Sequence, residues 1–384
     1  AWVSTPIHPL ATLTLASPPP PHAASSPPLL SAAKATPLCA NGFPPGFVWG
    51  LGTAAYQIEG GAREFGRQPS IWDFFSHVEG RVRDGDTGDV ACDHIHRYLE
   101  DVRLMSSIGL SHYRFSISWS RVMYYSHETG RMEANEAGLR FYDRLLDALV
   151  AAGISPCVTL YHWDLPLSLH THAGGWHTPE NEVMVTEFAR YAELCFERYG
   201  SRVKFWITFN EPWSFTIEGY DSGKSAPGCA TFQPDAGRCV DGGVTVYQVA
   251  HNVLNAHAAA VALYRSKYQR RQGGTISITL NCEISLPASS SEADVAAAER
   301  ANEFMLGWWL QPVLTGEYPA VMREMVGERL PRFTLRQSLL LKGSIDILAL
   351  NHYSTHIVSD GGGDGFVSNW CSWADDQRVY SRFG

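Results

Sequence analysis

Short apolar runs alternate with longer amphipathic segments along the chain from Phe47 onward. The runs have the length and composition of buried strands, and the segments between them repeat apolar residues at helical spacing. The runs predict six strands, at residues 47–54, 113–118, 156–160, 203–209, 275–281 and 346–350. The segments predict crossover helices at residues 93–107, 135–152, 180–199 and 244–271, and residues 292–314 indicate a helix that runs into a loop. This alternation is typical of an α/β protein with a parallel sheet.

The number of strands bears on the architecture. Eight strand–helix units close a TIM (β/α)8 barrel, whereas six leave two sheet edges with unpaired backbone groups. We therefore expect an α/β fold of the TIM barrel type, with about six of the eight units present in residues 41–384. An open doubly wound sheet also accommodates six strands. No glycine-rich phosphate loop follows the first run, however, which removes the usual reason to prefer that sheet.

A carboxylic acid follows the fourth predicted strand. Asn210, Glu211, Pro212 and Trp213 come directly after the run at residues 203–209. Reacting groups in a barrel project from the carboxyl ends of the strands, so Glu211 is the best candidate for a residue that transfers protons. A glutamate before a proline can also simply close a strand. The polar residues at the other strand ends therefore decide between a catalytic and a structural interpretation of the tetrad.

Composition and charge argue against several classes of partner. The net charge of −9 over 384 residues does not provide the basic surface that phosphate binding requires, so we expect no nucleic-acid partner. No apolar run approaches the length of a bilayer span, so we expect no membrane span. The 15 histidines are dispersed and no spacing of His and Cys resembles a zinc site. We predict no metal and no cofactor, and the sequence does not indicate an oligomeric state.

The first 40 residues differ from the rest of the chain. They are rich in Pro, Ser and Ala and contain no Asp or Glu. This composition fits a disordered leader or the remnant of a targeting peptide, and the sequence leaves that choice open. Among the eight cysteines, Cys229 and Cys239 bracket a loop with Gly and Pro that one disulfide would close.

Seven motifs follow one another in the predicted barrel. They are TAAYQIEG at 53–60, SIWDF at 70–74, TGDVACD at 87–93, YRFSISWSRV at 113–122, YHWDLP at 161–166, ITFNEPW at 207–213 and LNHYS at 350–354. In this order they resemble glycoside hydrolase family 1, the β-glucosidase family, and most closely its plant-type members. The resemblance runs from Phe47 to about Thr355. It implies a retaining hydrolase of terminal β-D-glucosyl bonds that acts on a small β-glucoside.

The resemblance implies roles for the residues around the tetrad. Glu211 is expected to be the acid/base, which protonates the departing glycosidic oxygen and later deprotonates the water that releases the sugar. Asn210 beside it would bond to the sugar 2-hydroxyl. Arg114 and Tyr353 match positions that in the family hold the nucleophilic carboxylate and keep it ionised.

Four further residues are expected to form the sugar pocket. Gln57, His162 and Asn351 match the family's sugar-binding positions, where an amide or imidazole can both donate to and accept from hydroxyls. Trp163 follows His162 and would line the pocket. Taken singly, a His or Asn near a strand end is more often a satisfied structural residue than a ligand. Their joint placement at strand ends favours the sugar pocket.

The sequence departs from the family in one respect that bears on catalysis. A retaining β-glucosidase needs two carboxyl groups about 5 to 5.5 Å apart, and the resemblance supplies only Glu211. Nothing between Tyr353 and Gly384 resembles the Ile-Thr-Glu-Asn-Gly-like motif that holds the family's nucleophile. We therefore expect that the chain is C-terminally truncated, that a nucleophile Glu lies beyond its end, and that these residues alone are inactive.

Alternatives to an active β-glucosidase remain open. Another hydrolase of the same barrel clan, such as a cellulase or mannanase, also places Asn-Glu after a fourth strand, although the other motifs argue against it. A sugar-binding pseudoenzyme or an inactive fragment would keep the pocket without the nucleophile. Cys229 and Cys239 also match a loop disulfide of the plant-type enzymes, which weakly favours a secreted or vacuolar protein.

Overall fold

The computed structural model describes Phe43 and residues 46–229, 241–361 and 372–383. Residues 40–384 form one compact unit. The leader predicted for residues 1–40 lies outside the described residues.

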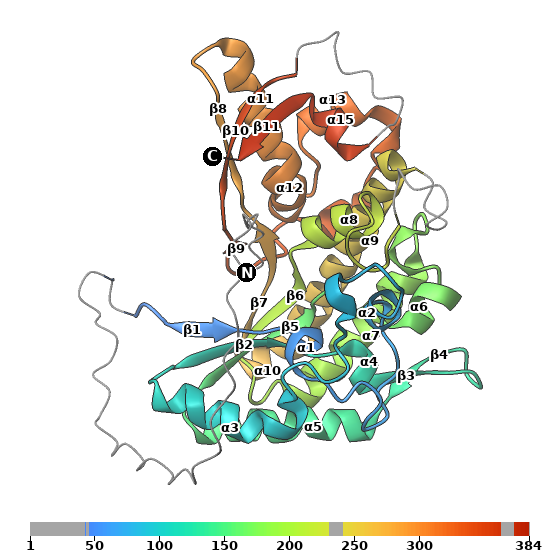
Figure 1. The fold of residues 1–384 in the computed structure, drawn as a ribbon, viewed down its shortest axis with the longest axis vertical. Coiled ribbons are helices and arrows are strands. Elements are labelled where there is room, and N and C mark those ends of the chain that lie inside the picture. The colour runs from blue at the N-terminus through green and yellow to red at the C-terminus, as the bar shows by residue number, and fades with distance from the viewer. Residues whose placement is uncertain (1–42, 44–45, 230–240, 362–371, 384) are drawn as a thin grey trace, which may run out of the picture. The chain divides into compact units, whose positions relative to one another are not determined.

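A six-stranded parallel sheet forms the centre of this unit (Figure 1). Its strands lie side by side in the order β1 (Gly50–Gly52), β2 (His112–Ser116), β5 (Ser155–Tyr161), β6 (Phe205–Asn210), β7 (Thr275–Asn281) and β9 (Ala349–Asn351). Each predicted strand is therefore found, and consecutive ones are neighbours. The register pairs Tyr113 with Pro156, Val158 with Trp206 and Asn281 with Asn351.

The two edge strands are shorter or shifted relative to the prediction. The run predicted at residues 47–54 is a strand only over Gly50–Gly52, and the one predicted at 346–350 begins at Ala349. Each of these strands pairs with one neighbour in the sheet as described. Fewer backbone hydrogen bonds therefore hold the flanking residues in a regular strand. Asp346 itself is held differently, because its carboxylate accepts from Arg265 at 2.5 Å and from the backbone N–H of Ile276 at 2.9 Å.

Long helices connect the strands, as the sequence predicted. They are α3 (His94–Ser107), α5 (Glu136–Ala151), α7 (Glu182–Tyr199) and α9 (Gly242–Leu263). The fourth predicted helix continues beyond α9 through a π-helical turn, η3 (Tyr264–Tyr268), into α10 (Gln269–Gln272). α9 packs against α7, α8 (Pro212–Tyr220) and α14 (Leu335–Leu341), which explains why apolar and small residues cover nearly all of its sides.

The segment predicted as a helix running into a loop stays helical to its end. It comprises α11 (Glu292–Asn302), a π-helical turn η4 (Glu303–Gly307) and α12 (Trp308–Thr315), which contains Pro312. Gly316 ends it with a left-handed backbone, φ +85°, a conformation that glycine adopts without steric cost.

Shorter elements fill the connections. Two small sheets are the hairpin of β3 (Met123–Ser126) with β4 (Arg131–Ala134), and a three-stranded sheet in the order β11 (Val379–Phe383), β10 (Thr355–Asp360), β8 (Ile284–Pro287), on which α11 packs (Figure 1). The short helices are α1 (Ala55–Ile58), α2 (Ile71–Ser76), η1 (Arg83–Gly85), α4 (Trp119–Val122), α6 (Leu167–His172), η2 (Gly175–His177), α8 (Pro212–Tyr220), α13 (Ala320–Val326), η5 (Gly327–Arg329), α14 (Leu335–Leu341) and α15 (Trp373–Gln377).

Stacked aromatic rings fill the space between the sheet and the helices. Phe188 of α7 stacks on Phe209 of β6 with ring centres 4.4 Å apart, and Trp119 stacks on Tyr191 at 4.9 Å. The Tyr191 hydroxyl donates to the backbone carbonyl of Leu160 at 2.7 Å, so its polar end is also satisfied. Burying one such side chain contributes roughly 1.5 to 3 kcal/mol. This packing fixes the strand from which the Asn210–Glu211 pair emerges.

A buried ion pair ties the first two strand–helix units together. Arg121, at the end of α4, donates to the Glu59 carboxylate at 2.8 Å, and the Tyr142 hydroxyl donates to the other oxygen at 2.5 Å. Arg121 is fully buried and Glu59 is 4% exposed. Such a cluster is stable only when all its members are present, because each charge would otherwise be buried without a partner.

Candidate active site at the carboxyl ends of the strands

Glu211 stands at the junction between β6 and α8. Its backbone N–H donates to the carbonyl oxygen of Thr279 on β7 at 2.9 Å, and Pro212 occupies the first turn of α8. Between them the backbone of Glu211 is left-handed, with φ +48°. For a residue with a side chain this conformation costs about 1 to 2 kcal/mol and is found most often where function requires a particular side-chain direction. The strand-to-helix turn thus fixes the direction in which the Glu211 side chain leaves the backbone.

Three side chains donate hydrogen bonds to the Glu211 carboxylate. The Asn351 amide reaches Oε1 at 2.6 Å and the Tyr353 hydroxyl reaches the same oxygen at 3.3 Å. The Ser214 hydroxyl reaches Oε2 at 3.2 Å and in turn accepts from the Asn281 amide at 2.8 Å. Glu211 is only 8% exposed. Hydrogen bonds to both oxygens therefore orient the carboxylate, and the residue keeps a small exposed fraction.

Asn210 is the centre of a second network. Its side-chain oxygen accepts from Arg114 at 2.6 Å and from Asn351 at 3.2 Å, and its amide nitrogen lies 3.3 Å from Nε2 of His162. The indole N–H of Trp163 donates to the Asn210 backbone carbonyl at 2.8 Å. Five residues predicted from the sequence therefore lie in direct contact, although they come from four different strands or strand ends.

Burial sets the protonation of the polar groups in this network. It lowers the pKa of His162 to about 3, with a smaller contribution from the Arg114 charge, so the ring is neutral and has one donor and one acceptor nitrogen. Burial also lowers the pKa of Arg114, which the nearby Glu211 and Tyr353 partly offset. The pKa of Tyr353 is raised by burial first and by the Glu211 charge next.

Gln57 is set apart from these networks. It lies in α1, its side chain is exposed, and no hydrogen bond joins it to the other predicted residues within the described part of the chain. Its predicted sugar contact stays a prediction. Cys229 is buried, whereas Cys239 falls among the undescribed residues 230–240. The predicted disulfide between these two cysteines therefore stays a prediction as well.

The sequence reasoning missed three residues at this site. Ser214 and Asn281 form the chain of hydrogen bonds that reaches Glu211, and Asn281 ends the predicted strand 275–281, so its position was a usable signal. Glu283 follows β7 and is half-buried. Burial raises the pKa of its carboxyl, and the Glu211 charge adds to that shift. A second carboxyl group thus lies in the field of the first.

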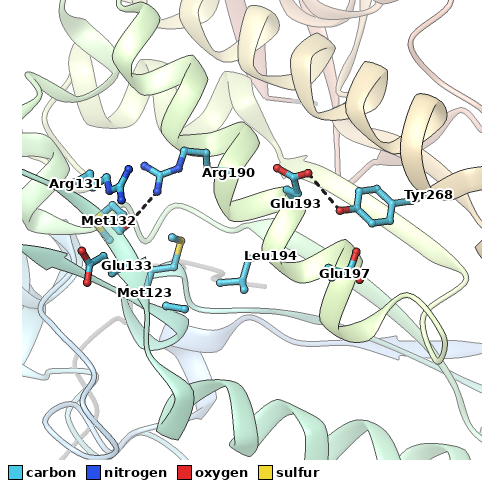
Figure 2. A pocket seen from close by; sticks show the side chains of 10 residues that line it. Met123, Arg131, Met132, Glu133, Arg190, Glu193, Leu194, Glu197 and Tyr268 are labelled. Carbon is cyan, nitrogen blue, oxygen red and sulfur yellow. Dashed lines mark hydrogen bonds between the residues drawn. The ribbon is translucent and has the colours of Figure 1, made fainter. Parts of the chain in front are cut away.

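A separate cavity lies away from Glu211. It has a volume of about 540 Å³ and lies between the β3–β4 hairpin and α7 (Figure 2). Its lining consists of Met123, Arg131, Met132, Glu133, Ala134, Arg190, Glu193, Leu194, Glu197 and Tyr268. Glu193 accepts from Lys267 at 2.8 Å and from Tyr268 at 3.3 Å, so its carboxylate is already paired. The cavity contains none of the predicted site residues.

Neither a clustered metal-binding site nor a helix able to span a membrane is found in the described ranges. These ranges hold no group of three or more His, Cys, Asp or Glu side chains placed to bind a metal ion. Among the same residues no helix combines the length and the apolar character that crossing a membrane requires. The side chains around Glu211 carry amide, hydroxyl, imidazole, guanidinium and aromatic groups.

Comparison with known proteins identifies the family of the chain. Residues 39–370 match glycosyl hydrolase family 1. The chain belongs to this family. Over 327 residues it is 47% identical to Beta-glucosidase 40 of Arabidopsis thaliana, an alignment that covers 84% of this chain and 62% of the relative. Raucaffricine-O-beta-D-glucosidase of Rauvolfia serpentina is 43% identical over 372 residues, which cover 91% of this chain and 68% of that one.

Solved structures of family 1 members share the fold. A rice beta-glucosidase structure superposes with a TM-score of 0.83 at 43% identity, over 88% of this chain and 70% of the other. A beta-glucosidase from the fungus Humicola insolens, solved with glucose, gives a TM-score of 0.81 at 39% identity, over 88% and 69% of the two chains. These family 1 enzymes are TIM barrels, and the six parallel strands described here correspond to part of such a barrel. The chain spans 62% of the length of the Arabidopsis relative and 60% of a rice one, Beta-glucosidase 6.

Proposed function

We propose that this family 1 chain carries the acid/base half of a retaining β-glucosidase, with Glu211 as the proton-transferring residue. The observation that carries the proposal is the arrangement around that carboxyl group. It emerges from the carboxyl end of β6, is held on both oxygens by Asn351, Tyr353 and Ser214, and stays 8% exposed. A group with this placement can give a proton to a glycosidic oxygen and later take one from water.

The neighbouring groups suit a pyranose substrate. In the proposal Asn210 bonds to the sugar 2-hydroxyl, while His162 and Asn351 bond to other hydroxyls and Trp163 lines the ring. His162 suits this role because its neutral imidazole both donates and accepts. A terminal β-D-glucosyl group is the proposed substrate class, in keeping with the names of the related beta-glucosidases.

Retention of configuration requires a second carboxylate that attacks the anomeric carbon. Glu283 is the carboxyl group found near Glu211, but burial raises its pKa and so favours its neutral form. A nucleophile needs the ionised form, and the family holds it with groups such as Arg114. Arg114 instead donates to Asn210 and Thr159. We therefore propose that residues 1–384 alone bind the sugar without turning it over, and that the nucleophile lies outside them.

The role of Glu211 can be tested without turnover. The probe is a gluco-configured inhibitor that carries a basic nitrogen at the position of the glycosidic oxygen, with its affinity measured by isothermal titration calorimetry. Glu211→Gln removes the charge-assisted hydrogen bond to that nitrogen and should weaken binding about 10- to 150-fold. Glu303→Gln is the matched control, since Glu303 is also a partly buried carboxyl but lies in η4. Equal binding by the wild type and Glu211→Gln would contradict the proposal.

Turnover is tested separately. The 384-residue chain should not hydrolyse an aryl β-glucoside, and measurable hydrolysis would refute the proposed inactivity. A chimera that continues from Gly384 into the corresponding remainder of a family 1 relative should hydrolyse it with retention, followed by NMR of the released sugar. In that chimera Glu211→Gln should slow unactivated glucosides more than aryl glucosides, because only poor leaving groups need the acid.

A sugar-binding pseudoenzyme is the second candidate. Two observations support it. The residues proposed to bind sugar hydroxyls contact one another around Asn210, and the neighbouring carboxyl group, that of Glu283, suits a nucleophile poorly. An inhibitor-binding chain whose chimera remains inactive would favour this candidate. A secreted or vacuolar location and the Cys229–Cys239 disulfide remain predictions.

A further inference from the structure

Two histidines on separate short helices lie next to each other in the chain segment after β5. His170 belongs to α6 and His177 to η2, and their ring centres lie 5.3 Å apart with the planes inclined by 49°. Nδ1 of each ring is buried and has no hydrogen-bond partner among the described residues. Buried polar nitrogens are normally paired, so two unpartnered ones on neighbouring rings call for an explanation.

The backbone at Gly175 leaves room beside Nδ1 of His170. A Cβ atom at Gly175 would lie 2.8 Å from Nδ1 of His170, closer than real Cβ contacts allow. Gly175 also has φ +56°, a conformation that side chains disfavour. Glycine at this position therefore keeps space beside the imidazole nitrogen.

The loop that carries His177 is held rigidly. The Asn181 amide donates to the carbonyls of Ala173 and Gly175 at 2.7 and 2.9 Å. The Asn252 amide of α9 donates to the carbonyls of Trp176 and Thr178 at 2.8 and 2.7 Å. The residues before and after His177 are thus both held by the Asn252 amide. Rigid support of this kind preorganises a binding site.

A third unpartnered group adjoins the pair. Tyr220 ends α8, its ring centre lies 6.0 Å from that of His177, and its buried hydroxyl has no partner within the described part of the chain. Tyr220 is 1% exposed.

We propose that His170 and His177 bind one late first-row divalent cation, of which Zn²⁺ is the test case, with water or the Tyr220 hydroxyl completing its coordination. Two imidazoles that hold one Zn²⁺ at about 2.0 to 2.1 Å and a tetrahedral angle have ring centres roughly 5 Å apart, as this pair does. The bound ion ties the loop after β5 to α8, whose first residue follows Glu211. It acts on stability and does not enter the proposed hydrolysis.

The sequence did not indicate this site because its histidines are dispersed and only two take part. Those two are seven positions apart, on helices whose relative orientation only the folded chain sets. A two-imidazole site also falls below the three side chains that define an evident metal centre.

Zn²⁺ binding to untagged protein in chelator-treated buffer tests the proposal, measured by isothermal titration calorimetry with ZnCl₂ alone. The wild type should bind one equivalent and its Tm should rise. His170→Gln and His177→Gln should each lower the affinity at least tenfold, since even loss of an outer-shell partner costs about 10- to 100-fold. His172→Gln is the control, because His172 is exposed on the same helix and lies against Tyr125. It should bind as the wild type does.

A second measurement on the wild type guards against variants that fail to fold. Anomalous scattering at the zinc edge from Zn²⁺-soaked crystals should place the ion between His170 and His177. Absence of binding by the wild type, unchanged affinity in folded His170→Gln and His177→Gln, or an ion located at His127 and His172 instead would overturn the proposal.

Discussion

The Asn351 amide donates a 2.6 Å hydrogen bond to Oε1 of Glu211 across 140 positions of sequence. The two residues end β9 and follow β6, and β7 lies between those strands in the sheet. The contact is possible because side chains at the carboxyl ends of parallel strands project to the same side of the sheet. Asn351 bonds to Asn210 as well, so it joins the carboxylate to the proposed sugar-binding network.

Replacing Asn351 should therefore weaken sugar binding. Asn351→Ala removes both the proposed bond to a sugar hydroxyl and the hydrogen bond that orients the Glu211 carboxylate, so affinity for the basic-nitrogen inhibitor should fall about 10-fold or more. Asn302→Ala is the matched control, because the Asn302 amide, at the end of α11, donates to the Ser285 carbonyl of β8 at 3.0 Å. Calorimetric titration distinguishes them, and an Asn351→Ala protein that binds as tightly as Asn302→Ala would refute this role.

The buried pair of Glu59 and Arg121 should matter for stability. Glu59→Gln leaves the Arg121 charge buried without its partner, which typically costs about 3 to 5 kcal/mol in the free energy of unfolding. Arg97 and Glu100 form an exposed pair at 3.0 Å, so Glu100→Gln should change stability little. Urea denaturation followed by circular dichroism measures both. Small and similar losses of stability in Glu59→Gln and Glu100→Gln would contradict the stabilising role of the buried pair.

Asp164 should make stability depend on pH. Burial raises the pKa of its carboxyl to about 7, while the Arg67 charge opposes this shift. Between about pH 4 and pH 7 the folded chain keeps a proton that the unfolded chain has released, so this group's contribution to stability decreases as pH rises. Asp164→Asn lacks that dependence. The free energy of unfolding of Asp164→Asn, minus that of the wild type, should therefore rise by up to about 1.4 kcal/mol per pH unit across this window.

The test of Asp164 compares denaturation curves of both proteins at matched pH values. Subtracting the wild-type curve cancels the contributions of all other titrating groups. The difference should grow from pH 4 to pH 7 and stay constant above that range. A difference that is independent of pH would show that the Asp164 carboxyl titrates normally.

Two glycines within helices should respond oppositely to alanine. A Cβ at Gly138 of α5 would lie 1.9 Å from the backbone carbonyl oxygen of Arg121, which cannot move freely, so Gly138→Ala should cost more than about 2 kcal/mol. At Gly307 the closest atom, at 2.1 Å, belongs to the flexible Glu303 carboxylate. Gly307→Ala should be neutral or stabilising by up to about 1 kcal/mol, because alanine favours helix. Thermal unfolding separates the two, and similar Tm values would be unexpected.

The sequence by itself determined the order of the strands and the position of Glu211 directly after the fourth of them. The strands are buried, so their apolar runs stand out, and parallel strands joined by helices become neighbours in chain order. Glu211 could be singled out because it directly follows such a run, and the family motifs located Arg114, His162 and Asn351 around it. All of these lie in the networks that the structure describes.

Only the tertiary structure decided which groups touch. The roles of Ser214 and Asn281, the proximity of Glu283 to Glu211, and the pairing of His170 with His177 depend on how separate helices and strands pack. Local sequence carries no record of such contacts, because a side chain's direction follows from the twist of the sheet and the closing of loops. The same reason explains Gln57, which lies in a matched motif and yet is exposed.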